Sequence, residues 1–326
     1  MMYTSNPFGK KPQKLAILGG SGFVGSHLIP RLVADGHQVT LLTRSRAYCG
    51  DRLLLPNTRV VELNVYDSDA LEEVLTGHDA VINLVGILNE SGFGGKGFQR
   101  AHVELTRILL AVMQSLGIQR YLHMSALGAG LGTSYYLKTR GQSEALVKQA
   151  ASNGLDITIY QPSVIFGAGD GFINRFADLL KIALVFPLAC SSSRFQPVWV
   201  GDVVEAFATT INKAESHGET YQLGGPRVFT LREIVNYCCQ QLQVKRLIIP
   251  LPKPLSWLQG KVLDFVPGKP FSSDNYKSLQ LDSVVTENHL PALGISPRSI
   301  ETTVPLYLGL GAKRRRIQQS HKGAGR

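Results

Sequence analysis

Three glycines early in the chain have the spacing of a phosphate-binding turn. Gly19, Gly22 and Gly25 follow the pattern GxxGxxG, and Phe23 and Val24 then open an apolar helical repeat. The first glycine permits a tight turn, the second lets N–H groups approach a pyrophosphate, and the third lets the helix pack on the strand. Because a helix N-terminus carries partial positive charge, the pattern predicts a bound dinucleotide. The alternative is a turn with a purely structural role.

A second group of residues could transfer a proton beside such a dinucleotide. Tyr136 and Arg140 are four residues apart, which places them on one face of a helix, and Ser125 ends an apolar run shortly before them. Next to a nicotinamide, the arginine would hold ribose and lower the pKa of the phenol, which could then pass a proton while hydride moves. The same spacing also suits a tyrosine in the core or at its rim, so both interpretations of Tyr136 stay open.

The end of the second apolar run indicates which dinucleotide would bind. It reads Thr43-Arg44-Ser45-Arg46, without an acid. An acidic residue here would bind the ribose 2′-hydroxyl of NAD, whereas an arginine accommodates the 2′-phosphate of NADP. Arg44 therefore favours NADP(H) over NAD(H). The alternative is an arginine that is solvated or stacks on adenine.

Two later strand ends complete the predicted cofactor site. Asn64 and Val65 follow the third apolar run, where the adenine would lie. Leu84, Val85 and Gly86 follow the fourth, where the backbone would meet ribose and pyrophosphate, although Gly86 could equally serve only as a turn.

Strands and helices alternate in a way that places all these residues at one edge of a sheet. Short apolar runs predict strands at 15–18, 39–42, 59–63, 79–85, 120–124 and 155–161. Helical patterns predict helices from 23 to 34, 69–75, 98–116 and 134–151. Six such rounds indicate an α/β fold with a doubly wound parallel sheet. The four glycines within 89–97 predict a mobile loop over the site.

The regular alternation of predicted strands and helices ends after Gly167, and this change predicts a smaller C-terminal cap. We expect helices at 172–184, 201–213, 230–242 and 296–310, and strands at 195–200 and 220–223, some of them returning to the main sheet. The predicted domains are a flexible N-terminus over 1–13, a dinucleotide-binding domain over 14–167, a cap or substrate region over 168–310, and a basic disordered tail over 311–326.

Composition is consistent with a globular chain in a reducing compartment. Of the 326 residues, 44% are hydrophobic and 18% are charged, which suits a sizeable core. The four cysteines have no CxxC spacing and predict reduced thiols in the cytoplasm. We find no metal-ligand cluster, no signal peptide, and no stretch with the roughly 18 apolar residues of a membrane span.

Positive charge is concentrated at the C-terminal end. The net charge is +10, and residues 311–326 hold six lysines and arginines and no acid. The simplest interpretation is a solvated tail. The alternative is that this tail contacts anionic lipid headgroups or nucleic acid. For the chain as a whole, nucleic acid is the least favoured partner.

Taken in order, these motifs resemble the short-chain dehydrogenase/reductase superfamily in its extended or atypical branch. The matching stretches are the glycine turn, 83–86, the strand ending at Ser125, the pair Tyr136 and Arg140, 161–167, 196–203 and 221–226. More narrowly, INLVGIL, QPVWVGDV and LIIPLPKPLSWL are similar to the nucleotide-binding accessory subunits of respiratory complex I and their bacterial relatives. The resemblance implies a Rossmann sheet, and cofactor contacts from Pro162, Val164 and Ile165.

The superfamily also implies a Ser/Thr–Tyr–Lys catalytic set, from which this sequence departs. Tyr136 matches the tyrosine, but Arg140 stands at the lysine position and Ala126 at the Ser/Thr position, with Ser125 just before it. An alignment shifted by one residue would return Ser125 to that position. Arginine stays charged and can bind ribose, but its geometry differs from that of lysine. The complex I subunits are not thought to carry hydride chemistry, in agreement with an incomplete set.

The resemblance also implies a role for residues 247–270, which combine an apolar surface with Lys253, Lys261 and Lys269. Such a segment could rest on a membrane surface. The alternative is an ordinary cap helix packed on the main domain. We expect the protein in the cytoplasm. A membrane contact through residues 247–270 would place it at the inner face of the cell membrane.

Three functions remain open from the sequence. The first is a nucleotide-binding accessory or sensing protein, in contact with a respiratory complex or a membrane surface. The second is an NADP-dependent reductase or epimerase acting on a quinone, an isoprenoid or another lipid-like molecule, or a nucleotide sugar, with Tyr136 as acid and base. The third is an RNA-binding member of the superfamily that uses the basic tail.

Overall fold

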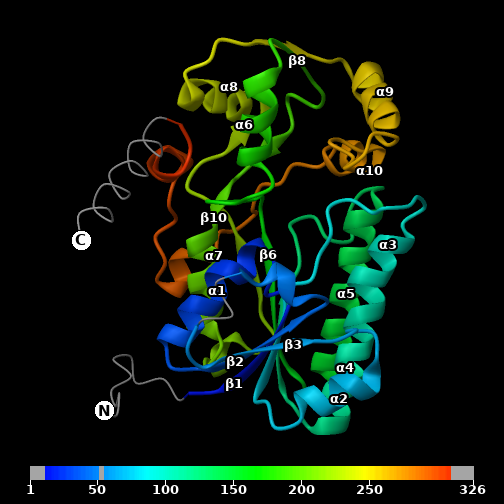
Figure 1. Cartoon of the computed structure of the whole chain (residues 1–326), viewed down its shortest axis with the longest axis vertical. Coiled ribbons are helices and arrows are strands. Elements are labelled where there is room, and N and C mark those ends of the chain that lie inside the picture. Colours follow the sequence, from blue (N-terminus) through cyan, green and yellow to red (C-terminus); the bar gives the residue numbers. More distant parts are fainter. Residues whose placement is uncertain (1–11, 51–54, 310–326) are drawn as a thin grey trace. The chain divides into compact units, whose positions relative to one another are not determined.

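The computed structural model describes residues 12–50 and 55–309 (Figure 1). It divides into two compact units. The first runs to Gln161 and also contains Val204–Tyr221; the second contains Pro162–Val203 and the chain from Gln222 onward. The predictions for the first eleven residues and for the basic tail 311–326 lie outside the described residues.

A seven-stranded sheet organises the first unit, with the strand order β11-β6-β5-β4-β1-β2-β3. The central strand β1 pairs in parallel with both β2 and β4, so the order reverses beside β1 and creates a switch point there. This arrangement confirms the predicted doubly wound sheet, which also contains the later strand β11. The strands are β1 (Lys14–Leu18), β2 (Gln38–Thr43), β3 (Thr58–Glu62), β4 (Ala80–Asn83), β5 (Arg120–Met124), β6 (Asp156–Pro162) and β11 (Thr220–Leu223).

Helices cover both faces of this sheet. Figure 1 shows α1 and α7 on one face, and α2, α4 and α5 on the other. The helical elements are α1 (Phe23–Ala34), η1 (Arg46–Tyr48), α2 (Ser68–Leu75), α3 (Lys96–Phe98), η3 (Gln99–Glu104), α4 (Leu105–Leu116), α5 (Tyr135–Ser152), α7 (Val200–Thr210) and η4 (Ala214–Ser216). Leu18, Leu109 and Tyr121 are fully buried in the core under α2, α4 and α5. Each such side chain stabilises the fold by about 1.5–3 kcal/mol, which holds the strand ends in place.

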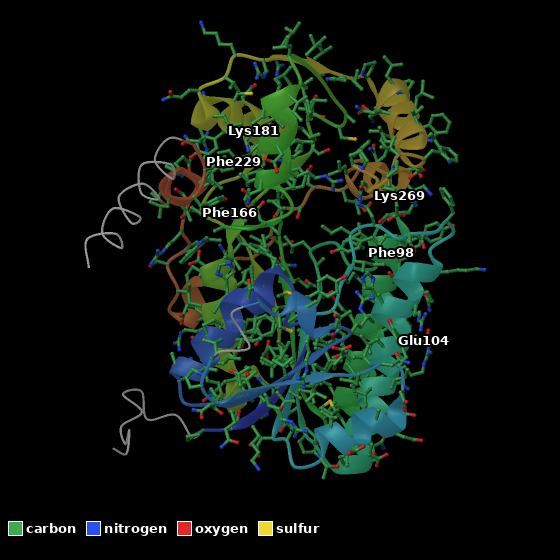
Figure 2. All side chains as sticks on the ribbon, in the orientation of Figure 1. Phe98, Glu104, Phe166, Lys181, Phe229 and Lys269 are labelled. Carbon is green, nitrogen blue, oxygen red and sulfur yellow. The ribbon has the colours of Figure 1, made fainter. Side chains whose placement is uncertain are left out.

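The single helix predicted over 98–116 consists of three consecutive pieces. Between α3 and α4, η3 is a π-helical turn. A π turn adds a residue to the helix circumference, and such turns often occur at functional sites. Here the turn buries His102 against α5. Figure 2 labels Phe98, the last residue of α3, and Glu104, the last residue of η3.

The glycine-rich loop before α3 is braced by a buried carboxylate. The N–H groups of Gly95 and Gly97 donate to Glu90 Oε1 at 2.7 Å and to Glu90 Oε2 at 2.9 Å. Gly95 has φ +82° and lies against the Tyr135 ring, where a Cβ would approach ring carbons to 2.5 Å. The loop predicted to be a mobile edge is thus tied by hydrogen bonds next to α5.

The second unit is built from short elements around its own core. Its three two-stranded sheets are β10–β7, β12–β9 and β13–β8. Phe166 and Phe229, labelled in Figure 2, belong to the buried core. The elements are β7 (Ile165–Phe166), α6 (Ile173–Ile182), β8 (Val185–Leu188), β9 (Arg194–Phe195), β10 (Val198–Trp199), β12 (Phe229–Thr230), α8 (Leu231–Leu242), β13 (Leu247–Pro250), α9 (Lys253–Leu263), α10 (Ser273–Ser278), η5 (Pro291–Leu293), α11 (Ile300–Thr303) and η6 (Val304–Leu306).

Two predictions in this unit are wrong, and proline explains both. The strand expected over 195–200 is split into β9 and β10, because Pro197 has no N–H to donate to a sheet. The helix expected over 296–310 is only α11 followed by η6, because Pro305 interrupts the helical hydrogen bonds. Every helix among the described residues is too short or too polar to span a bilayer.

Candidate functional site

The glycine turn between β1 and α1 forms a cradle in which Gly19 and Gly25 are each needed for a different reason. Gly19 has φ +75°, and a Cβ there would lie 2.9 Å from the backbone of Leu84 and Val85. A Cβ on Gly25 would lie 2.4 Å from Gly20 Cα, so the helix packs directly on the turn. Gly22 N–H donates to Gly19 O at 3.0 Å and begins α1.

This cradle suits an anion. Within the described part of the chain, no side chain caps the start of α1, and no acidic residue lies in its first turn. The N–H groups and the positive end of the helix are therefore directed at the place where a pyrophosphate would bind. Phe23 and Val24 are the first helical residues, and the Phe23 ring packs edge-on against His27 at 5.5 Å. The residues predicted from the glycine motif thus lie together at the turn and the start of α1.

The end of β4 lies directly against this cradle, and its backbone is fixed by a buried side chain. Leu84 N–H donates to Leu18 O at 2.9 Å. Val85 N–H donates to Asn83 Oδ1 at 3.0 Å, and Asn83 Nδ2 donates in turn to Tyr121 OH at 3.0 Å. The carbonyl and amide groups of Leu84 and Val85 are thereby held where the backbone was predicted to meet the cofactor.

The two arginines after β2 have different roles. Arg46 is committed to the fold, because its Nη2 donates to Val60 O at 3.1 Å and its N–H donates to Glu62 Oε2 at 2.9 Å. Arg44 is exposed, and among the described residues no hydrogen bond or ion pair to its guanidinium is formed. Of the two, Arg44 is the cation available to a ligand phosphate.

The end of β3 lies beside Arg44 in the sheet, since Thr43 and Glu62 are partners across β2 and β3. Val65 is buried in the core, so a contact between Val65 and an adenine would use its backbone. Tyr66 N–H donates to Asn64 Oδ1 at 3.2 Å, which turns the chain. The guanidinium of Arg100 lies 4.3 Å from the Tyr66 ring centroid, a cation–π contact that the sequence analysis missed because it joins distant segments.

The predicted catalytic residues are brought together at the end of β5. Tyr136 is partly exposed, and Arg140 Cζ lies 5.5 Å from its ring centroid. Arg140 Nη1 donates to Met124 O at 2.8 Å and to Val85 O at 3.4 Å, which joins the ends of β5 and β4. Gly86 allows this approach, because a Cβ there would lie 1.9 Å from Arg140 Nη2. Gly86 is therefore more than a turn residue.

Two buried polar atoms in this region have no partner. Ser125 Oγ and Arg140 Nε form no hydrogen bond with the described residues, although the two side chains are only 3% and 5% exposed. Such orphaned groups are rare and costly unless a ligand satisfies them. Together with the cradle, they show that the residues present fit a bound dinucleotide or a ligand beside it.

A buried polar network behind this region was missed by the sequence analysis. His102 lies 5.7 Å from the Tyr136 ring, and its ring nitrogens contact Thr139 Oγ1 at 2.8 Å and Ile87 N at 3.3 Å. Thr139 Oγ1 donates its own proton to the carbonyl of Tyr135. Nδ1 of His102 must therefore carry a proton, and Nε2 accepts from Ile87.

His123 belongs to the same network and has the opposite tautomer. Since Asn83 donates to Tyr121, the Tyr121 hydroxyl donates to His123 Nδ1 at 3.2 Å. His123 Nε2 then donates to Ser143 Oγ at 3.0 Å, Ser143 to Thr106 at 3.0 Å, and Thr106 to His102 O at 2.7 Å. One directed chain of hydrogen bonds thus runs from β4 to η3. Its only sequence signal is the four-residue spacing of His102 with Thr106 and of Thr139 with Ser143.

Both histidines are neutral. Burial, reinforced by the positive charge of Arg140, lowers the pKa of His102 to about 2 and the pKa of His123 to about 3. Each ring already has a donor and an acceptor partner, so neither gains from a second proton. Arg140 is therefore the buried cation of this region.

The three site residues predicted after β6 belong to the second unit. Pro162 ends β6, Val164 O accepts from Val198 N at 3.0 Å, and Ile165 begins β7. Their role at the cofactor stays a prediction.

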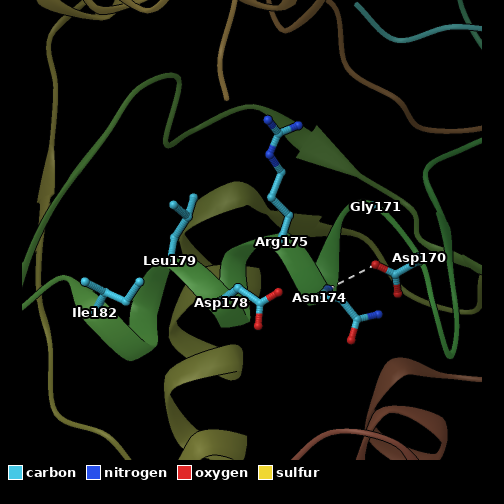
Figure 3. Close-up of a pocket in the computed structure, with 7 residues that line it drawn as sticks. All are labelled: Asp170, Gly171, Asn174, Arg175, Asp178, Leu179 and Ile182. Atoms are coloured by element: carbon cyan, nitrogen blue, oxygen red, sulfur yellow. Dashed lines mark hydrogen bonds between the residues drawn. The ribbon is translucent and has the colours of Figure 1, made fainter. Parts of the chain in front are cut away.

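A surface hollow of about 430 Å³ lies along α6 in the second unit (Figure 3). Its polar residues serve the fold. Asp170 accepts from the N–H groups of Gly167, Phe172 and Asn174, and from the Tyr307 hydroxyl. Arg175 donates to the carbonyls of Gly268 and Lys269. Nowhere in the described ranges do three or more His, Cys, Asp or Glu side chains gather as a metal site.

Comparison with known proteins finds relatives over most of this chain. The chain is 28% identical over 291 residues to the mitochondrial NADH dehydrogenase [ubiquinone] 1 alpha subcomplex subunit 9 of Arabidopsis thaliana, covering 84% of this chain and 71% of that protein. It is 27% identical over 301 residues to the subunit of the same name from Mus musculus, covering 87% and 77%. The predicted resemblance to complex I subunits is thus confirmed.

A solved structure and a family model agree on the fold class. The dTDP-glucose 4,6-dehydratase of Streptomyces venezuelae, solved with bound NAD, superposes with a TM-score of 0.70 at 21% identity, covering 89% of this chain and 94% of that one. The model of the NAD dependent epimerase/dehydratase family matches residues 15–224, which include the glycine turn, Tyr136 and Arg140. The chain therefore belongs to the NAD dependent epimerase/dehydratase family.

Proposed function

We propose that this protein binds NADP(H) as a nucleotide-loaded accessory or sensing protein of a respiratory complex, and does not turn the cofactor over rapidly. The observation that carries the proposal is the contrast within one site. The phosphate seat of Gly19, Gly22 and Gly25 is fully formed, whereas Ala126 and Arg140 occupy the positions of two catalytic side chains. Cofactor binding depends mainly on backbone groups, so it survives those replacements.

A bound dinucleotide would supply hydride chemistry, and the residues of this chain would hold and orient it. Gly22 and the start of α1 would face the pyrophosphate, and the fixed backbone groups of Leu84 and Val85 would lie beside it. Arg140 keeps its charge beside Tyr136, but its Nη1 is bound to two carbonyl oxygens. Position 126 holds an alanine, so no hydroxyl side chain at that position can orient the proton of the Tyr136 phenol.

Native mass spectrometry of the purified full chain tests this proposal directly. Release of the cofactor should give NADP(H) at close to one molecule per chain. A protein that copurifies with no dinucleotide, and binds neither NAD(H) nor NADP(H) when they are added, would exclude it.

The exposed guanidinium of Arg44 supports NADP(H) over NAD(H). Arg44→Gln should weaken NADPH about tenfold and leave NADH affinity nearly unchanged, because only the 2′-phosphate contacts the arginine. Arg46→Gln is the matched control, since Arg46 serves β3. Equal affinities of the wild type for NADPH and NADH would contradict the preference.

A contact with a membrane surface is the second proposal, favoured by α9. This helix buries only Ser256 and Gly260, whereas the large apolar side chains around it are exposed by 48–80%: Leu255, Trp257, Leu258, Val262 and Phe265. Lys261 lies 5.8 Å from the Trp257 ring. Exposed apolar residues next to lysines suit the headgroup region of an anionic bilayer, and the protein would then sit peripherally at the inner face of the cell membrane.

Sedimentation with vesicles tests this contact. Wild-type protein should pellet with vesicles containing phosphatidylserine, and the double variant Trp257→Ser, Phe265→Ser should remain in the supernatant. Leu306→Ser is a control at an exposed leucine outside α9. If the double variant sedimented with vesicles as fully as Leu306→Ser does, the proposal would be contradicted. If the protein bound an isolated protein subunit and not the vesicles, the exposed surface around α9 would be a protein interface.

Reduction or epimerisation remains the alternative function, favoured by the partly exposed phenol of Tyr136 beside Arg140. A quinone, an isoprenoid or a nucleotide sugar would be the substrate. This function predicts a change in nicotinamide absorbance with such a substrate, and its loss in Tyr136→Phe.

A further inference from the structure

Arg140 is a buried cation without a counter-ion. Arg140 is only 5% exposed. Among the described residues, no carboxylate forms an ion pair with its guanidinium. Glu144, one helical turn further along α5, is engaged by Gln161 at 2.8 Å and Lys148 at 3.6 Å. His102 and His123 are bonded as neutral rings. A buried charge of this kind is strongly destabilising unless something compensates it.

The guanidinium is only half used. Both of its protein bonds come from Nη1, to Met124 O and Val85 O. Nε is buried without a partner, so the edge formed by Nε and Nη2 has no acceptor in the described part of the chain. That edge is the one with which arginine binds a carboxylate or a phosphoryl group through two parallel bonds.

Ser125 supplies a further buried group, next in the chain to a residue that binds Arg140. It follows Met124, whose carbonyl binds Arg140, and its N–H donates to Tyr160 O at 2.7 Å. Its Oγ is buried without a partner. An Nε–H group can only donate, and a hydroxyl can donate as well, so both unpaired groups match a ligand oxygen that carries negative charge.

We propose that Arg140, through its Nε–Nη2 edge, and Ser125 bind an oxyanion, either a carboxylate or a phosphoryl group. The inference rests on the proposed function, because it names a ligand group beside the predicted dinucleotide. A lysine in place of Arg140 would present a point charge suited to ribose hydroxyls. The arginine presents a planar fork suited to an acid. The oxyanion belongs either to an acidic small molecule or to the dinucleotide itself.

Thermal unfolding of the full chain tests the proposal with inorganic phosphate and acetate as probes, against chloride at equal ionic strength. Phosphate or acetate should raise the wild-type midpoint by on the order of 3 °C beyond chloride. Arg140→Met should abolish that response, and Arg107→Met, at an exposed arginine of α4, should keep it. Without added anion, Arg140→Met should unfold at the same or a higher temperature, because it removes an uncompensated buried charge.

Two further variants keep the test decisive if Arg140→Met does not fold. Arg140→Lys keeps the charge but lacks the fork, and should weaken the anion response at least about tenfold. Ser125→Ala should weaken it less. A wild-type response equal to that in chloride, or an anion response that Arg140→Met and Arg140→Lys both retain, would overturn the proposal.

Measurements with and without saturating NADPH distinguish the two sources of the oxyanion. A response that persists with NADPH bound assigns the oxyanion to a second, acidic ligand. A response that NADPH removes, together with weaker NADPH binding in Arg140→Lys, assigns it to the dinucleotide. If wild-type protein binds no NADPH, the proposed function fails, but the response to phosphate can still be measured. A response lost only in Gly22→Asp would place the anion at α1 and overturn the assignment to Arg140.

Discussion

The two ends of the candidate site depend on different parts of the chain, the backbone at one end and side chains at the other. At the phosphate end, the binding groups are backbone N–H groups, and the requirement on sequence is the absence of side chains at Gly19, Gly22 and Gly25. At the other end, the chemistry depends on which side chains stand at positions 126, 136 and 140. A single substitution can therefore remove catalysis while leaving cofactor binding intact. Under the proposed function, a chain of an enzyme family keeps its ligand in this way while it serves another purpose.

The phosphate end should be the most sensitive to charge. Gly22→Asp places a carboxylate where the pyrophosphate binds, at the positive end of α1, and we expect dinucleotide affinity to fall on the order of 1000-fold. A Cβ at this position would lie 3.2 Å from Gly19 O, a tight but tolerable contact, so the variant should fold. Fluorescence titration with NADPH measures the effect.

Gly22→Ala is the matched control, because it adds the same Cβ without the charge. Its affinity should fall by only about tenfold. If circular dichroism showed that Gly22→Asp is folded, and this variant bound NADPH as tightly as Gly22→Ala, the pyrophosphate would have to bind elsewhere.

The other end should respond to restoration of the family's side chains. The double variant Ala126→Thr, Arg140→Lys supplies a hydroxyl and an ammonium group beside Tyr136. We expect NADPH oxidation, with a short-chain quinone or a nucleotide sugar as substrate, to rise about 100-fold over the wild type, in the range of general acid catalysis. Absorbance of the nicotinamide follows the reaction, at an NADPH concentration that saturates both the wild type and the double variant.

Adding Tyr136→Phe to that double variant is the control, and it should return the rate to the wild-type level. A wild-type protein that already oxidises NADPH as fast as the double variant would show that Arg140 and Ala126 do not limit catalysis. The contrast between the two ends of the site would then be lost.

The sequence predicted the elements and residues that depend on local patterns. The glycine turn, the apolar strands and the pair Tyr136 and Arg140 are all defined within a few residues, and the doubly wound sheet follows from their alternation. Pro197 and Pro305 were visible in the sequence, but their effect on weak elements was underestimated.

The rest of the site depends on long-range contacts that no local pattern reports. Arg140 reaches Val85, and the network that joins Asn83 to Tyr121 and His123 to Ser143 links segments 20 to 55 residues apart. The π turn at Gln99–Glu104 has no periodic signal of its own, yet it buries His102 beside Tyr136. A histidine in an amphipathic helix gives no indication that its ring will be buried and neutral.

These buried histidines give the smallest of the expected effects, a dependence of stability on pH. Their pKa values are lowered in the folded protein, to about 3 for His123, so the unfolded chain takes up protons first as the pH falls. Stability should therefore be full above about pH 6.5 and decrease as the pH falls toward about 3. Each histidine contributes a slope of up to about 1.4 kcal/mol per pH unit.

Urea unfolding at about pH 6 and about pH 5 measures that slope, in a range where exposed carboxylates titrate little. His123→Gln removes one of the two groups and should flatten the slope by up to about 1.4 kcal/mol per pH unit. A slope that is the same in wild type and His123→Gln would mean that the ring accepts a proton in the folded state. Arg140 would then share its buried surroundings with a second cation, which makes an oxyanion beside it still more necessary.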